Sequence, residues 1–219
     1  MKIAFILRGH FRTFEKVQEL WKHSLNNCNY DCFFHTWNTI DSTTKSWCKD
    51  PKDSELLTDN KLSILKSWDP NIVVEHQFYT DDELNDIYAT ATYKSYIYKF
   101  NSLKETLDRI DESKYDIILV GRYDLIIKNV NFINDLCINP NEIFIGARGN
   151  DNRFLYGLAT SDCLFAFNSK DKYKFYNMPN DYIDRKFTYS EEAYVDFYYK
   201  SFDKVTHKWH QQTHFDIQR

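Results

Sequence analysis

Five consecutive apolar residues near the start of the chain, Ile3–Leu7, constrain the fold more than any other feature of the sequence. No polar side chain interrupts them, so both faces of the strand that they form must be buried. This is typical of a parallel sheet covered by helices on both sides. The residues that follow predict a helix over 14–25, with apolar side chains at three- and four-residue steps, and then a second strand at Tyr30–Trp37.

The alternation of strand and helix continues along the chain. Residues 38–59 are polar without a clear period, and we expect a long surface excursion there that is a candidate lid. Asp59 is the expected cap of the next helix. A third strand is expected at Ile72–Glu75, the longest helix over residues 93–110, and a second fully apolar strand at Ile117–Val120. Alternation of this kind favours a mainly parallel sheet with right-handed crossovers.

The last third of the chain has a mixed pattern, with strands expected at residues 142–146 and 163–167 and a helix at 190–200. A length of 219 residues suits one domain, which we expect to span residues 1–219. The sequence therefore predicts the α/β class, as a single Rossmann-like domain with a mainly parallel central sheet flanked by helices.

The composition bounds the partners and the compartment. A net charge of −4 gives no general attraction to nucleic acid, which we do not expect as a partner. No apolar stretch approaches the ~20 residues that a membrane-spanning helix requires. Five cysteines, an odd number without a Cys-x-x-Cys pair, suggest reduced thiols in a cytoplasmic protein.

The polar turn that follows the first strand is the first candidate ligand site, because open α/β sheets bind ligands at the carboxyl ends of their strands. Gly9 lets the backbone approach a ligand, and Arg8 and Arg12 can donate forked hydrogen bonds to diphosphate oxygens, with His10 between them. The alternative is a solvated turn with two surface arginines, and the residue types favour neither interpretation.

Asp124 is the strongest single candidate, since a carboxylate at the exit of a buried strand can hold Mg²⁺ or Mn²⁺ against substrate phosphates. From composition alone, a role as the cap of a turn is slightly favoured over metal binding. Arg122 and Tyr123, directly before Asp124, are candidates to bind the same substrate. At the end of the second strand His35 and Trp37 are candidates to line a base or sugar pocket, although core packing also explains Trp37.

Late acidic residues are candidates for a catalytic base, which must lie within hydrogen-bond reach of the acceptor hydroxyl. Glu191 and Glu192 follow Ser190, so capping and the helix dipole explain them too. Asp162, beside the apolar run 163–167, is a further candidate for contact with the sugar or acceptor, or simply the end of a strand. Three histidines near the C-terminus could share a helix face as metal ligands, but on an irregular tail they would not. They are His207, His210 and His214.

Three segments resemble a known family, the viral and bacterial GT-A glycosyltransferases, which include the WavE-type lipopolysaccharide and capsule synthesis proteins and the amino-terminal domain of a chlorovirus capsid-glycosylating enzyme. The segments are Ile3–Phe14, Phe33–Trp37 (Phe-Phe-His-Thr-Trp) and Tyr115–Leu125. The third segment includes Gly121, Arg122, Tyr123 and Asp124. The second adds Thr36 to His35 and Trp37 as a candidate donor-binding residue.

The resemblance implies a nucleotide-sugar donor, commonly a uridine diphosphate sugar, and Mn²⁺ or Mg²⁺ held by an Asp-x-Asp motif. Here Arg122 occupies the first acidic position and only Asp124 matches, so the arginine itself is a candidate to offset diphosphate charge. The late pair of glutamates is similar in placement to the family's catalytic base. A terminal histidine, among which we favour His214, corresponds to one that completes the metal shell.

The function expected from these residues and the resemblance is metal-assisted glycosyl transfer from a nucleotide diphosphate donor to a hydroxyl of a glycan or glycoprotein. Residues 1–130 are the expected nucleotide-binding half and 131–219 the acceptor-binding half. The alternatives are a nucleotidyltransferase, for which the same sheet and carboxylate are suitable, and a non-catalytic carbohydrate-binding module. The 5 Trp, 16 Tyr and 17 Phe residues would give such a module stacking surfaces.

Overall fold

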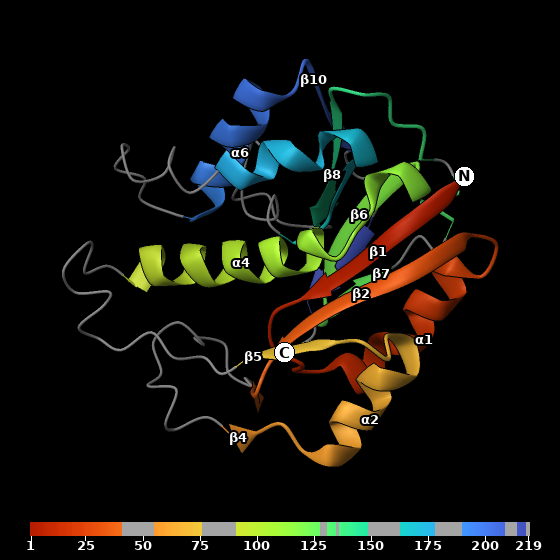
Figure 1. Cartoon of the computed structure of the whole chain (residues 1–219), viewed down its shortest axis with the longest axis vertical. Coiled ribbons are helices and arrows are strands. Elements are labelled where there is room, and N and C mark those ends of the chain that lie inside the picture. The colour runs from red at the N-terminus through yellow and green to blue at the C-terminus, as the bar shows by residue number, and fades with distance from the viewer. Residues whose placement is uncertain are drawn as a thin grey trace.

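The computed structural model describes most of the chain, with gaps between the described segments. The described residues are 1–40, 55–75, 91–127, 131–134, 136–148, 163–177, 190–208 and 214–217. Figure 1 shows their arrangement, in which one twisted sheet runs through the molecule and helices lie on both of its faces.

Strands and helices alternate through the first half of the chain, as the sequence predicts. The elements up to residue 127 are β1 (Lys2–Arg8), α1 (Phe14–Leu25), β2 (Asn29–Trp37), β3 (Thr39–Ile40), β4 (Glu55–Leu56), α2 (Asp59–Trp68), β5 (Val73–Glu75), α4 (Ala91–Asp108), η3 (Glu112–Lys114), β6 (Ile117–Arg122) and β7 (Leu125–Ile127). The later elements are β8 (Glu142–Arg148), β9 (Phe165–Asn168), η5 (Ser169–Asn177), α6 (Ser190–Ser201), β10 (Lys204–Lys208) and β11 (His214–Ile217).

The main sheet has the order β5-β2-β1-β6-β9-β8-β11-β7, with β10 paired to β8. β1 lies parallel to both β2 and β6, and β2 is parallel to β5. β9 is antiparallel to both of its neighbours, β6 and β8, and β7 is antiparallel to β11. The mainly parallel α/β sheet is therefore confirmed, with antiparallel strands in the half that the sequence pattern left mixed.

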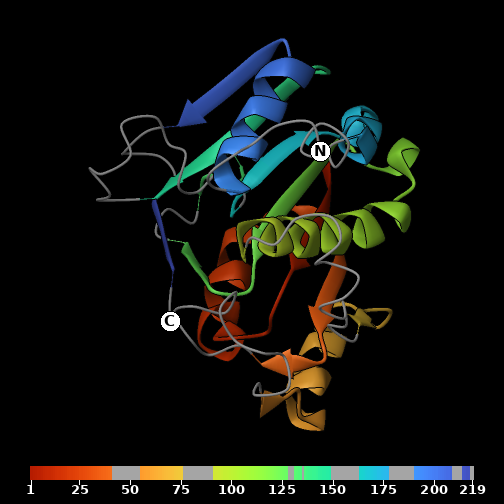
Figure 2. The ribbon, with the colours of Figure 1, turned by 90° about the vertical axis from the view of Figure 1, so that its left-hand side faces the viewer.

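The two faces of the sheet carry separate hydrophobic cores, because successive side chains of a strand point to opposite faces. Phe5 and its neighbours on one face pack with the apolar side of α1, including Trp21. On the other face Ile6 packs in a cluster with Leu103 of α4 and Tyr198 of α6. Figure 2 shows α4 crossing the strands in front of the sheet. The unbroken apolar run of β1 thus reflects a strand buried on both sides.

Two details near the expected lid differ from the sequence prediction. Thr58, not Asp59, is the N-cap of α2, since its hydroxyl accepts a hydrogen bond from the backbone N–H of Lys61. The cap must have an extended backbone, and Thr58 has one while Asp59 already belongs to the helix. Part of the expected excursion is ordered, because β3 and β4 form a two-stranded antiparallel sheet. Residues 41–54, which hold the rest of it, lie outside the described residues.

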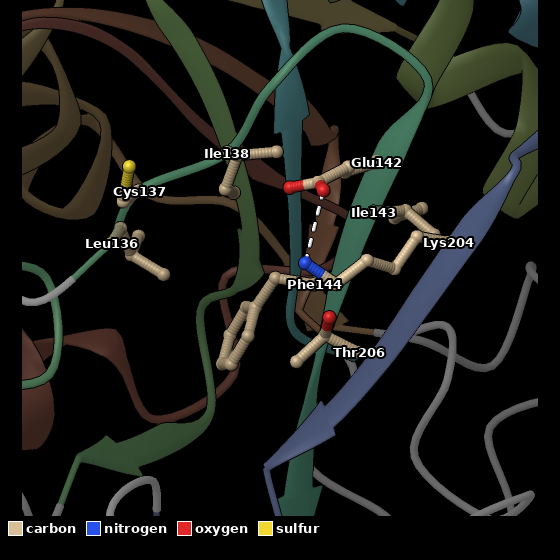
Figure 3. Close-up of a pocket in the computed structure, with 8 residues that line it drawn as sticks. All are labelled: Leu136, Cys137, Ile138, Glu142, Ile143, Phe144, Lys204 and Thr206. Carbon is tan, nitrogen blue, oxygen red and sulfur yellow. Dashed lines mark hydrogen bonds and ion pairs between the residues drawn. The ribbon is translucent and has the colours of Figure 1, made fainter.

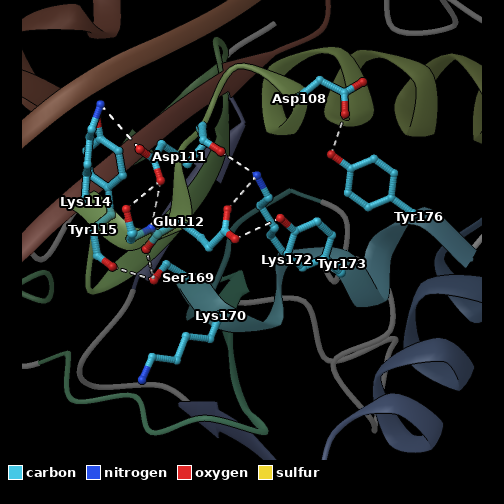
Figure 4. A network of polar contacts seen from close by, with 12 residues as sticks. Asp108, Asp111, Glu112, Lys114, Tyr115, Ser169, Lys170, Lys172, Tyr173 and Tyr176 are labelled. Carbon is cyan, nitrogen blue, oxygen red and sulfur yellow. Dashed lines mark hydrogen bonds and ion pairs between the residues drawn. The ribbon is translucent and has the colours of Figure 1, made fainter.

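A network of polar contacts closes the amino edge of the sheet, before β6 begins (Figure 4). Lys172 of η5 forms an ion pair with Glu112 of η3 at 3.0 Å, and the hydroxyl of Tyr173 donates to the same carboxylate at 2.8 Å. The hydroxyl of Ser169 lies within hydrogen-bond distance of the Glu112 and Tyr115 carbonyl groups. These contacts hold η5 against the connection between α4 and β6, which is a structural role.

The four cysteines of the described segments are all free thiols. They are Cys28, Cys32, Cys137 and Cys163. None of the described helices has the length and apolar character that crossing a bilayer demands.

Candidate functional site

The site begins at the point where the strand order reverses. From β1 the chain moves outward to β2 and β5 on one side, and it later returns to β6 on the other side of β1. Loops that leave neighbouring parallel strands in opposite directions open a crevice at the carboxyl ends, and ligands of open α/β sheets bind there. Arg8 and Arg122, which end β1 and β6, are partners in the register of these two strands. We call the carboxyl ends of β1 and β6, with the turns that follow them, the switch-point rim.

The turn after β1 folds back on itself, so that Arg12 reaches the end of β6. Gly9 has φ of 101° and Arg12 has φ of 45°, and the second value is uncommon for a residue with a side chain. Phe11 is fully buried and anchors the turn, and its carbonyl accepts the backbone N–H of Phe14. Arg12 Nη1 then donates to Asp124 Oδ2 at 2.6 Å. A left-handed residue costs about 1–2 kcal/mol, so the fold accepts local strain to hold this guanidinium in place.

Asp124 joins two arginines from different parts of the chain. Its Oδ1 accepts from Arg122 Nε at 3.0 Å, and its Oδ2 accepts from Arg122 Nη2 at 2.7 Å as well as from Arg12. The side chain of Asp124 is 1% exposed, whereas those of Arg12 and Arg122 are 16% and 17% exposed. Burial alone would raise the pKa of Asp124, but the charges of Arg122 and Arg12 and their hydrogen bonds outweigh it and lower that pKa. The carboxylate is therefore ionised at neutral pH.

Arg8 connects the rim to two helices on one face of the sheet. Its Nη1 donates to the carbonyl of Lys99 in α4 at 2.9 Å, and its Nη2 donates to the hydroxyl of Tyr194 in α6 at 3.5 Å. The guanidinium carbon lies 5.9 Å from the centre of the Tyr194 ring. Arg8 is itself buried, so it fixes the start of α6 beside the end of β1.

The expected catalytic acids map to this same region in part. Glu191 and Glu192 lie in the first turn of α6, one turn before Tyr194, and their side chains lie outside the described residues. Asp162 also lies outside the described residues. The roles of these acids therefore stay predictions. Sequence reasoning missed Tyr194, and its only signal is an aromatic residue one turn after the acidic pair on an expected helix.

The candidate metal ligands do not form a cation site in the described structure. Both oxygens of Asp124 accept hydrogen bonds from guanidinium groups, and Arg122 stands where a second carboxylate would be needed. In the described segments no three His, Cys, Asp or Glu side chains gather so that they could hold a metal ion. This donor set does not fit Mg²⁺ or Mn²⁺, which take open oxygen ligands. The expectation that Asp124 holds a metal is thus not supported by its surroundings.

Two of the three C-terminal histidines, His207 and His214, lie on different strands of the sheet. His214 lies on β11 opposite Ala147, at the carboxyl end of β8 and so on the same edge of the sheet as Asp124. His207 lies on β10 opposite Ile145, within a strand and not on a helix. His210 and the side chains of the other two lie outside the described residues. A role for His214 at the rim stays a prediction.

The polar residues at the end of β2 lie inside the protein. His35 and Thr36 are fully buried and Trp37 is nearly so. The rings of His35 and Trp37 pack edge to face, with their centres 4.7 Å apart. His35 Nε2 lies 3.0 Å from Glu75 Oε2 of the neighbouring strand. Tyr123 is buried as well, and its hydroxyl donates to the His35 carbonyl at 2.9 Å. Packing between β2, β5 and the β6 turn accounts for these residues, and a direct contact of any of them with a donor stays a prediction.

The turn after β1 has one open side. A Cβ atom placed on Gly9 would meet no heavy atom of the described residues within 4 Å, so these residues leave room beside the backbone there. Next to it, His10 Nδ1 lies 3.2 Å from the carbonyl of Thr39 in β3. The first turn and the small β3–β4 sheet therefore meet beside this opening.

A separate cavity lies at the opposite edge of the sheet. Its volume is about 110 Å³. Glu142 and Lys204, at the starts of β8 and β10, line the cavity and form an ion pair with each other (Figure 3). β8 runs in the same direction as β6, because both are antiparallel to β9, so this cavity is at the amino edge and away from the switch-point rim. None of the predicted site residues lines this cavity.

Comparison with known proteins gives a fold but no sequence relative. No protein-family model matches the chain, and no curated protein matches its sequence. Among solved structures, the galactosyltransferase LgtC, in complex with donor and acceptor sugar analogs, matches with a TM-score of 0.54 and 11% identity over 94% of this chain and 73% of its own. The chain has a GT-A glycosyltransferase fold.

Two further glycosyltransferase structures also align with this chain. One is an enzyme involved in glycosylation of the major capsid of PBCV-1, with a TM-score of 0.49, 9% identity, and coverage of 94% of this chain and 82% of its own. The other is the bifunctional glycosyltransferase WbbM in its apo form, with a TM-score of 0.47, 13% identity, and coverage of 95% and 38%.

Proposed function

We propose that this protein transfers a sugar from a nucleoside diphosphate donor, of which a uridine diphosphate sugar is the first candidate, to a hydroxyl group of a glycan or glycoprotein. The observation that carries the proposal is the convergence of Arg12, Arg122 and Asp124 at the switch point between β1 and β6. A GT-A fold supports this class of reaction, and the structure of LgtC with donor and acceptor sugar analogs supports a donor and an acceptor as ligands.

Arginine chemistry suits the leaving group of this reaction. Departure of the sugar leaves a negative charge on the diphosphate, and planar guanidinium groups bind phosphate oxygens through two parallel hydrogen bonds. Donors that are fixed before the reaction stabilise this charge without having to reorganise. Asp124 fixes Arg12 and Arg122, and Arg8 is fixed by α4 and α6. Of these three, the two partly exposed arginines are those that a diphosphate at the rim would meet.

The acceptor side belongs to the second half of the chain in this proposal, with residues 1–130 binding the nucleotide and 131–219 the acceptor. Glu191 or Glu192 removes the proton from the attacking hydroxyl, and Asp162 contacts the sugar or the acceptor. The support is the contact between Arg8 and Tyr194, which brings the first turns of α6 to the rim. A base must lie within hydrogen-bond reach of the hydroxyl that it activates, and the first turn of α6 lies one turn from Tyr194.

Product analysis tests the proposal. The protein is incubated with a panel of nucleotide sugars and the released phosphates are identified. Glycosyl transfer or donor hydrolysis releases a nucleoside diphosphate, whereas nucleotidyl transfer releases pyrophosphate. Glu191→Gln and Glu192→Gln, tested separately, identify the base, because the correct variant should lose 10²- to 10⁴-fold in rate while still binding the donor. Release of pyrophosphate would replace this proposal with the nucleotidyltransferase, and glycan binding without nucleotide binding would replace it with the carbohydrate-binding module.

A further inference from the structure

We infer that this site binds the donor diphosphate without a divalent cation, using Arg12 and Arg122 as the positive groups and Asp124 as the residue that positions them. The inference rests on the proposed function, which supplies the nucleoside diphosphate. It concerns only how the charge of that ligand is balanced.

Both oxygens of the Asp124 carboxylate are bonded to guanidinium groups. A Mg²⁺ or Mn²⁺ ion binds a carboxylate oxygen directly and keeps several waters. The two oxygens of Asp124 instead accept three N–H groups, from Nε and Nη2 of Arg122 and from Nη1 of Arg12, at 2.6 to 3.0 Å. The side chain is also 1% exposed, so an ion with its waters has no approach to it in this arrangement. A cation at Asp124 would have to displace two guanidinium groups and then lie beside them, where like charges repel.

The side chains of Arg12 and Arg122 are partly accessible from outside. Arg12, Arg122 and Asp124 form an ion triad in which the two arginines are partly exposed. The arginines come from the turn after β1 and the end of β6, which flank the switch point. Arg122 is the last residue of β6, whose other residues are all buried, and Arg12 is held by a turn in which its own backbone is left-handed. Two guanidinium groups that are fixed in this way lose little freedom when they bind phosphate oxygens, which is the advantage of preorganisation.

The position of Arg122 in the sequence also favours binding of an anion. It stands two residues before Asp124, where an Asp-x-Asp motif has its first carboxylate. An arginine there reverses the sign of the charge that faces the ligand, from one that attracts a cation to one that attracts the diphosphate itself. At this position the chain therefore carries a group that binds anions and not one that binds cations.

Binding measurements with and without a chelator test the inference. Uridine diphosphate and other nucleoside diphosphates are titrated calorimetrically into the protein, once in excess EDTA and once in MnCl₂. We expect Kd values that agree within about threefold between the two conditions. A Kd at least tenfold lower with Mn²⁺, or binding only with Mn²⁺, overturns the inference and leaves the proposed function intact. Absence of binding by every nucleoside diphosphate in both conditions overturns the proposed function and this inference together.

Variants show whether the arginines carry the binding. Arg122→Gln should raise the Kd in EDTA by about 10- to 100-fold, the loss expected for a charge-assisted hydrogen bond, and Arg122→Lys should lose part of it because lysine lacks the planar fork. Lys114→Gln is the matched control, because Lys114 is 66% exposed and precedes β6 at the opposite edge of the sheet. Its Kd should not change.

Folding is measured separately, by the thermal unfolding midpoint of each variant. If Arg122→Gln lowers the midpoint but leaves the Kd unchanged, the triad is only a structural ion pair and the inference is wrong. The chelator experiment uses the unaltered protein and does not depend on whether the variants fold.

Discussion

At the scale of single residues, Asp124 in the turn between β6 and β7 holds the site together. It is buried and ionised, and it accepts hydrogen bonds from the guanidinium groups of Arg12 and Arg122, which lie 112 and 2 residues before it in the sequence. A buried carboxylate of this kind is costly without its partners, and the arginines lose their orientation without it. The site therefore depends on a single ion triad, and a change at any member should affect both stability and ligand binding.

Asp124→Asn should lower the free energy of unfolding by about 3 kcal/mol near neutral pH, as expected when one partner of a buried ion pair is lost. The pKa of Asp124 is lowered in the folded protein, so its stabilisation is present above the unfolded pKa of about 3.9 and is lost as the pH falls through the folded value. Urea unfolding of both proteins from neutral pH down to acid measures the difference, which should shrink below about pH 4.

Glu19→Gln serves as the control for this experiment. Glu19 forms an exposed i,i+3 pair with Lys22 on α1, and its loss should cost less than about 0.5 kcal/mol. A difference between wild type and Asp124→Asn that stays constant with pH would show that the carboxylate charge is not what stabilises the triad.

At the scale of elements, β6 and α1 approach closely at Gly121, where a larger residue would crowd its neighbours. A Cβ atom at Gly121 would lie 3.0 Å from two atoms of the Trp21 ring and 3.2 Å from Leu7. Trp21 is fully buried and packs on Phe5 with ring centres 4.8 Å apart, so it has little room to move. This packing sets the position of β6, and with it the position of Arg122.

Gly121→Ala should therefore destabilise the protein by about 1–3 kcal/mol, the usual cost of overpacking a core. The smaller ring in Trp21→Phe should relieve the clash, so that in this background the added methyl group costs less than about 0.5 kcal/mol. Urea unfolding of the wild type, both single variants and the double variant gives the coupling energy. Equal effects of Gly121→Ala in both backgrounds would mean that the Trp21 ring is not the obstacle.

The start of α2 offers a smaller test of local structure. Thr58 caps the helix through a 3.4 Å hydrogen bond, so Thr58→Ala should lower the free energy of unfolding by about 0.5–1 kcal/mol. Thr58→Ser retains the hydroxyl and should cost much less. Chemical denaturation compares the two variants, and equal losses would exclude the cap as the source of the effect.

At the scale of the whole molecule, the two edges of the sheet differ in their chemistry. The carboxyl edge carries the arginines, the open turn at Gly9 and the start of α6. The amino edge is closed by the contacts of Glu112 with η5. Ligand binding should therefore change one edge and leave the other as it is.

Hydrogen exchange with a saturating nucleoside diphosphate should show this polarity. Amides of residues 8–12 and of the first turns of α6 should exchange more slowly, while residues 112–116 and 169–176 keep their rates, apart from the global stabilisation of about 2.7 kcal/mol expected at a ligand concentration of 100 times Kd. Mass spectrometry of peptides from these regions measures the change. Protection centred on the amino edge would place the ligand elsewhere.

Much of the fold could be predicted from the sequence, because the signals are local. The apolar runs at Ile3–Leu7 and Ile117–Val120 predict strands buried on both faces, and both are central strands of the sheet. Periodic apolar side chains predict α1, α4 and α6 close to their observed bounds. The antiparallel placement of β9 between β6 and β8 carries no such signal, since a short apolar strand has the same pattern in either direction.

The sequence by itself determined that the chain forms an α/β sheet with arginines and a carboxylate at its strand exits, because burial and periodicity act over neighbouring residues. Only the tertiary structure decided that Arg12 and Arg122 both bind Asp124, and that Arg8 meets a tyrosine 186 residues further along. These contacts depend on which strands become neighbours, and strand order is set by the packing of the whole core rather than by any local pattern. The same packing brings the guanidinium groups of Arg12 and Arg122 onto the carboxylate of Asp124.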